Sequence, residues 1–100
     1  MTPAPRVLGL RALGLGDFCC AVPAWKALRR AFPHHRLVLA APAWQRPLLD
    51  LCPWIDDLDP VADLDGPAPV TRRADLAVNL HGRGPASTRL LEATAPARLL

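Results

Sequence analysis

The sequence predicts an α/β domain with a mainly parallel sheet and flanking helices, and three observations lead to this prediction. Apolar runs of strand length alternate along the chain with amphipathic helical patterns. The first of these runs is nearly continuous in apolar residues, as expected of a strand that is covered on both faces. The composition, 51% hydrophobic and 21% charged, is that of a globular protein. Because strands alternate with helices, right-handed crossovers are expected between the strands.

The opening of the chain predicts a strand followed by a long helix. Residues 7–13 form the apolar run of the strand. The helix is predicted from Asp17, which suits an N-cap, to Phe32, because apolar residues recur there at helical spacing. Pro23 lies inside this pattern, so we expect a bent first turn or a regular helix that begins near the proline. The opposite face, which carries Arg29, is expected to be solvated.

The middle of the chain predicts two further strands with a short helix between them. Residues 36–41 form the second strand, and a helix disturbed by an internal proline is predicted between Pro42 and Pro53. Residues 54–58 are predicted to form a short third strand. From there to Arg73 the chain is rich in Pro, Asp and Gly, which indicates an irregular, solvated connection.

The last third of the chain repeats the alternation. Residues 75–80 predict a strand, and residues 85–95 predict a helix with Pro85 in its first position. Residues 98–100 have the pattern of the start of another strand. A parallel sheet usually contains more strands than 100 residues can supply, so we expect this domain to be incomplete.

The charge pattern argues against a nucleic-acid partner. The formal net charge of +3 comes from eleven arginines and a single lysine that are scattered along the chain. There is no basic stripe interleaved with aromatic residues, and the chain has no tyrosine. The excess of arginine over lysine is better explained by compositional bias, and we expect no nucleic-acid partner.

No metal site is predicted either. The three cysteines lack C-x-x-C spacing and are expected to be reduced thiols of a cytosolic protein. His34 and His35 have no third ligand at a suitable spacing, so they predict a turn. The aspartates between residues 50 and 65 lack the glycine and the closing glutamate of a calcium loop.

The hydropathy pattern predicts neither a signal peptide nor a membrane span. Arg11 interrupts the apolar N-terminal segment, and no run approaches the roughly 20 apolar residues that a span needs. We therefore expect a cytoplasmic protein with, at most, peripheral contact with the inner membrane surface.

Three loops are expected to meet at the carboxyl edge of the sheet, where open parallel sheets bind ligands. These are residues 14–17, 42–46 and 81–84. The glycines of the first loop do not make a dinucleotide fingerprint, because Cys19 stands at the third glycine position. A P-loop is excluded because no Lys-Ser or Lys-Thr pair follows them.

These loops contain the candidate site residues. At a helix N-terminus Asp17 stays ionised, so it can accept a proton as a general base, although a role as a plain N-cap is equally compatible with the spacing. Arg46 and Arg83 suit bidentate contacts with a phosphate or carboxylate. His81 suits hydrogen bonding to a sugar hydroxyl or a second acid–base role. An ordinary surface role remains an alternative for each of the last three residues.

Three segments in order resemble the start of the family 9 glycosyltransferases, which include the ADP-heptose:lipopolysaccharide heptosyltransferases. The first is the run Leu13-Gly14-Leu15-Gly16-Asp17 with its following helix to Pro33, and the others are residues 41–49 and 75–80. The resemblance extends over nearly the whole chain. It implies a GT-B architecture of two Rossmann-like domains, with the acceptor on the N-terminal domain and the nucleotide sugar mainly on the C-terminal domain.

The resemblance also implies a reaction and roles for individual residues. The reaction is the inverting, metal-independent transfer of a heptose-like sugar to an acceptor hydroxyl, with no cofactor. Asp17 would be the base, and Gly14 and Gly16 would let the backbone approach the substrates. Residues 1–100 would then be the N-terminal, acceptor-side domain, truncated and without the C-terminal donor domain, so the 100 residues alone are expected to be inactive.

Two interpretations of the function are the main ones, beside a third, a small redox or metal protein, which elemental analysis and thiol titration would reveal. In the first, the partners are a nucleotide sugar and a glycan or glycolipid acceptor of the lipopolysaccharide or another cell-envelope glycan. In the second, the chain is a non-catalytic Rossmann-like module that binds a nucleotide or a phosphate, or a truncated remnant of an enzyme. Turnover that depends on Asp17 separates the two.

Overall fold

The computed structural model describes residues 5–10, 15–62, 66–69, 71, 73–80 and 85–100, and the side chains of residues 15–21 lie outside this description. Four parallel strands form one sheet in the order β3-β2-β1-β4. The strands are β1 (Arg6–Leu10), β2 (Arg36–Ala41), β3 (Asp57–Pro60) and β4 (Leu76–Asn79). The helices are α1 (Leu15–Ala31), the 3₁₀-helix η1 (Ala43–Leu51) and α2 (Pro85–Glu92).

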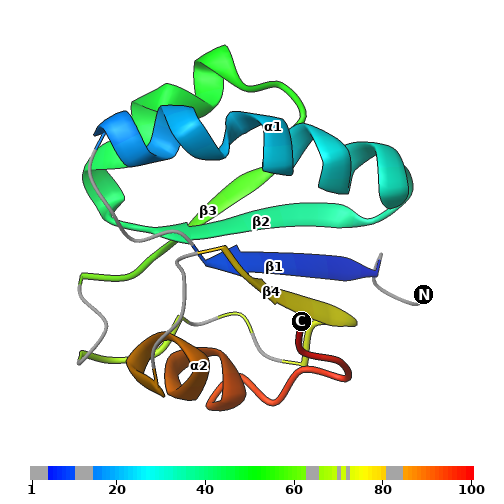
Figure 1. Cartoon of the computed structure of the whole chain (residues 1–100), viewed down its shortest axis with the longest axis vertical. Helices are drawn as coiled ribbons and strands as arrows, with labels where there is room; N and C mark the ends of the chain where they lie inside the picture. Colours follow the sequence, from blue (N-terminus) through cyan, green and yellow to red (C-terminus); the bar gives the residue numbers. More distant parts are fainter. Residues whose placement is uncertain (1–4, 11–14, 63–65, 70, 72, 81–84) are drawn as a thin grey trace.

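The sheet is covered on both faces, with α1 and η1 on one side and α2 on the other (Figure 1). Each face has its own apolar cluster, because neighbouring residues of a strand point to opposite sides. On the α1 side Val7 and Leu39 pack with Trp25, whose side chain is fully buried. On the α2 side Leu8 and Val38 pack with Leu90. The predicted fold class, a parallel sheet with flanking helices, is therefore confirmed.

The C-terminal residues extend the sheet beyond β4. Leu99 forms a parallel bridge with Ala77, and the backbone N–H of Leu100 donates to the carbonyl of Ala77 at 2.9 Å. The backbone N–H of Asn79 in turn donates to the carbonyl of Leu100 at 2.9 Å. The predicted start of a strand at residues 98–100 is confirmed as this pairing.

The expected start of the first helix is wrong. Helix α1 begins at Leu15 and Pro23 lies in its interior, so the regular helix does not start near the proline. Pro23 is exposed, which places its ring on the solvent side, while Trp25 two residues later is fully buried against the sheet. Pro23 has no backbone N–H to donate, which weakens the helix at this point. The packing of Trp25 against the sheet compensates by stabilising the helix. Asp17 is the third residue of α1, in its first turn, and not the N-cap.

Two elements of the middle segment also differ from the prediction. The helix after β2 is present, but it is a 3₁₀-helix with Pro47 inside it. In its first turn the backbone N–H of Gln45 donates to the carbonyl of Pro42, three residues earlier, at 3.0 Å. Strand β3 spans Asp57–Pro60, so it begins three residues later and ends two residues later than the predicted residues 54–58. Ile55 packs into the core before the strand begins, because its N–H closes a turn to Cys52 at 3.0 Å.

The aspartates of this region are more ordered than expected. Asp59 lies in β3 with 4% of its surface exposed, and the backbone N–H of Thr71 donates to its Oδ2 at 2.7 Å. The expectation of a wholly solvated acidic connection is therefore wrong for this residue. Asp59 ties the connection between β3 and β4 to the face of the sheet.

Arg29 is not a solvated charge, which corrects the expectation for this face of the helix. Its Nη1 donates to the carbonyl of Trp54 at 3.2 Å and to Oδ2 of Asp56 at 2.9 Å. Its Nη2 donates to the carbonyls of Phe32, at 2.8 Å, and of His35. The guanidinium thus satisfies carbonyls at the end of α1 and joins this end to the segment before β3.

Replacing Arg29 with Met is expected to lower the free energy of unfolding by about 2 kcal/mol, since several hydrogen bonds to a charged group are lost. Urea denaturation measures this loss. Arg30→Met is the matched control, because Arg30 is exposed in the same helical turn and its replacement should change stability by less than about 0.5 kcal/mol. Equal effects of the two variants would show that the bonds of Arg29 add nothing.

Candidate functional site

The order of the strands defines where a ligand-binding crevice should lie. The connection from β1 to β2 runs through α1 on one face, whereas the connection that leaves β4 runs through α2 on the other face. In open α/β sheets the crevice lies outside the carboxyl ends of the two strands where the connections change sides. Here these strands are β1 and β4, and both α1 and α2 begin at that edge, on the left in Figure 1.

Two predicted site residues lie at this edge. Gly16 and Asp17 are in the first turn of α1, directly after the carboxyl end of β1. A carboxylate in the first turn is stabilised by the partial positive charge of the helix N-terminus. The side chain of Asp17 lies outside the described part, as do Gly14 and the predicted contacts His81 and Arg83.

Arg46 is placed differently from the other predicted contacts. It lies in η1, where its Nη2 donates to the carbonyl of Leu58 at 3.2 Å and its Nη1 is 3.7 Å from Oδ1 of Asp57. Both partners belong to β3, an edge strand that β2 separates from the crevice strands. In this position Arg46 covers a backbone carbonyl of the sheet edge. A contact between Arg46 and substrate stays a prediction.

The sequence reasoning missed Asn79 as a site residue and counted it only as part of a strand. Asn79 is the last residue of β4, at the carboxyl edge of the sheet. Its Nδ2 donates to Oγ of Ser87 in the first turn of α2 at 2.9 Å. The backbone N–H of Leu80 donates to the carbonyl of Leu10 at 3.1 Å, which continues the pairing of β4 with β1. A polar amide at the end of an apolar strand, just before a predicted loop, was the available signal.

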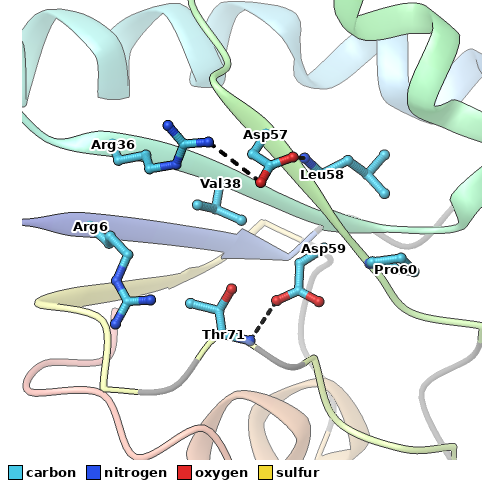
Figure 2. Close-up of a pocket in the computed structure, with 8 residues that line it drawn as sticks. All are labelled: Arg6, Arg36, Val38, Asp57, Leu58, Asp59, Pro60 and Thr71. Atoms are coloured by element: carbon cyan, nitrogen blue, oxygen red, sulfur yellow. Dashed lines mark hydrogen bonds and ion pairs between the residues drawn. The ribbon is translucent and has the colours of Figure 1, made fainter. Parts of the chain in front are cut away.

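A groove with a volume of about 150 Å³, lined by both charged and apolar residues, lies elsewhere, beside β2 and β3 (Figure 2). Its charged groups are engaged within the protein, since Arg36 Nη2 is 3.5 Å from Oδ2 of Asp57 and Asp59 accepts the N–H of Thr71. These pairs make the groove a structural junction between the strands and the connection that follows β3. None of its lining residues comes from the carboxyl ends of β1 and β4, where the crevice is expected.

The described residues show neither a metal-binding cluster nor a membrane-spanning helix. Within this part of the chain there is no group of three or more His, Cys, Asp or Glu residues that could hold a metal ion. The same residues include no helix that is both long and apolar enough to cross a membrane.

The strand order and the helices on both faces of the sheet define a doubly wound, Rossmann-like α/β domain. No family model matches the chain, and no curated protein matches it. Among solved structures it is similar to the glycosyl transferase family 9 structure from Veillonella parvula DSM 2008, with a TM-score of 0.66 and 21% sequence identity. The match covers 90% of this chain and 30% of the length of that chain. The fold is thus that of part of a family 9 glycosyltransferase structure, as the sequence resemblance implied.

Proposed function

We propose that this chain forms the acceptor-side domain of a glycosyltransferase that moves a heptose-like sugar from a nucleotide sugar to an acceptor hydroxyl. The observation that carries the proposal is the position of Asp17. Its backbone lies in the first turn of α1 at the crevice of β1 and β4, in a fold similar to that of a family 9 glycosyl transferase. An ionised carboxylate at this edge is the group that a transfer to a hydroxyl requires.

In the proposed reaction Asp17 removes the proton of the acceptor hydroxyl while the hydroxyl oxygen attacks the anomeric carbon of the sugar. A bond forms between this oxygen and the anomeric carbon, and the bond from the anomeric carbon to the phosphate oxygen breaks. The nucleoside diphosphate leaves with the electron pair of that bond. Because attack comes from the face opposite the leaving group, the anomeric configuration inverts. The step needs a base and no metal or other cofactor.

The remaining predicted residues would bind and orient the substrates. His81 and Arg83 belong to the connection between β4 and α2, whose two ends lie at the crevice. Gly14 and Gly16 would allow close approach of the backbone. A second domain would hold most of the donor. We place the reaction in the cytoplasm, on a glycan or glycolipid acceptor of the cell envelope at the inner membrane surface.

The test is a transfer assay on the protein as its native source produces it. ADP-, GDP- and UDP-sugars serve as donors, and a glycolipid extract of the source cells serves as acceptor. We expect release of nucleoside diphosphate that depends on the acceptor, and a product with inverted anomeric configuration by NMR. Binding of a nucleotide without any acceptor-dependent release would favour the non-catalytic module. Retained configuration would rule out the single displacement with Asp17 as base.

A further inference from the structure

The bond between Asn79 and Ser87 joins two elements that meet at the crevice. Asn79 is the last residue of β4, and Ser87 and Thr88 lie in the first turn of α2. The amide Nδ2 of Asn79 donates to Oγ of Ser87 at 2.9 Å and to Oγ1 of Thr88 at 3.5 Å. One side chain therefore links the carboxyl end of a central strand to the N-terminal turn of the helix that follows it.

Burial makes this link stronger than a surface hydrogen bond. Ser87 is 1% exposed, and Asn79 is half-buried, so water competes poorly for the bond between them. Loss of one partner leaves the other as a buried polar group with fewer bonds, which costs more than the bond itself contributes. The first turn of α2 is thus held at one distance from the end of β4.

The backbone around Asn79 is fixed as well. Its N–H donates to Leu100 at 2.9 Å on the outer side of β4, and the N–H of Leu80 donates to Leu10 of β1 at 3.1 Å. Four residues, His81 to Gly84, connect Leu80 to Pro85 in the sequence. Both ends of this short connection are consequently set by bonds among described residues.

We infer that Asn79 is a positioning residue, which fixes the first turn of α2 against the end of β4 and so sets the acceptor side of the crevice. The inference rests on the proposed function. Asn79 acts through Ser87 and touches no reacting atom. A displaced first turn would hold the acceptor less well, because a preorganised site binds its ligand more tightly than one that must first be ordered. The role therefore concerns acceptor binding and leaves the chemical step to Asp17.

The experiment compares Asn79→Ala, Ser87→Ala and the double variant in the native protein, with the glycolipid extract as acceptor. We expect each single variant to raise the apparent KM for the extract about tenfold while kcat changes less than about twofold, because a binding interaction is lost uniformly. The apparent KM of the double variant should not exceed that of the more affected single variant, since each single substitution already removes the same hydrogen bond. Additive effects, or a loss confined to kcat, would overturn the inference.

Thr94→Ala is the matched control. The hydroxyl of Thr94 is fully buried and donates to the carbonyl of Leu91 at 2.7 Å, just beyond the other end of α2. The control should reduce stability by a similar amount yet leave KM unchanged. An equal rise of KM in Thr94→Ala would mean that general loosening of α2 explains the result, and the positioning role would be wrong.

Hydrogen exchange gives a second readout that needs no substrate. The amides of Arg89 and Leu90 bond to carbonyls of the first turn of α2, so opening of this turn speeds their exchange. We expect about tenfold faster exchange in Asn79→Ala and no change in Thr94→Ala. If the native protein transfers no sugar, the proposed function fails and exchange still decides the structural link. If the native protein transfers sugar but Asn79→Ala changes neither the exchange rates nor KM, the positioning role is wrong while the proposed function stands.

Discussion

Replacing Asp17 with Asn is expected to lower the turnover of the native protein about a thousandfold, which is the largest effect on activity that we predict. An amide has the size of the carboxylate but cannot accept the proton of the acceptor hydroxyl. The first turn of α1 tolerates asparagine, so the fold should be retained. Initial rates at saturating donor and acceptor measure the loss, and the thermal midpoint reports on folding.

Asp50→Asn is the matched control for this substitution. Asp50 is an exposed carboxylate near the end of η1, a helix that contacts β3. Its amide variant should keep the wild-type rate. A normal rate in Asp17→Asn would remove the base from the proposed mechanism. An equal loss in both variants would show that the effect does not depend on the crevice.

Replacing Gly9 with Ala is expected to destabilise the protein by about 3 kcal/mol, because a methyl group has no room at this position. An added Cβ would overlap with Cη2 and Cζ3 of the Trp25 ring, and this ring is fully buried between α1 and the sheet. A rigid aromatic ring in a packed core cannot move aside cheaply. Urea denaturation of the variant measures the change in the free energy of unfolding.

The sign of the stability change in Gly9→Ala distinguishes a clash with Trp25 from the intrinsic preference of strands for alanine over glycine. Alanine in a strand is ordinarily more favourable than glycine by about 0.5 to 1 kcal/mol, so without the close contact the variant would gain stability. Trp25→Phe supplies a second check, since the smaller ring leaves space beside β1. The double variant should be more stable than the sum of the two single changes predicts. Strict additivity would contradict direct contact between Gly9 and Trp25.

Local patterns were sufficient for the elements with strong periodicity. The largely apolar run 36–41 predicted β2 with its observed bounds, and the helical spacing up to Phe32 predicted α1 to within a residue at its end. Such patterns work because each residue of a strand or helix points in a direction that its position alone determines. Strand β3 was misplaced because its register depends on pairing with β2, where Asp57 lies opposite Val38.

The candidate site divides in the same way. The rule for parallel sheets was enough to place Asp17 at the carboxyl edge, because it depends only on the order of strands and helices along the chain. The partners of Arg29, Arg46 and Asn79 could not be predicted. Their side chains bond to groups 25, 12 and 8 residues away in the sequence, at Trp54, Leu58 and Ser87.

The sequence by itself determined the class of the fold and the order of strands and helices, since apolar pattern and connectivity are encoded locally. Only the tertiary structure decided which polar groups meet, because these groups are joined by the strand order and by the layers on either side of the sheet. It gave Arg29 and Arg46 hydrogen-bond partners within the fold and joined Asn79 to the first turn of α2. Long polar side chains have many accessible partners in an unfolded chain, and packing selects among them.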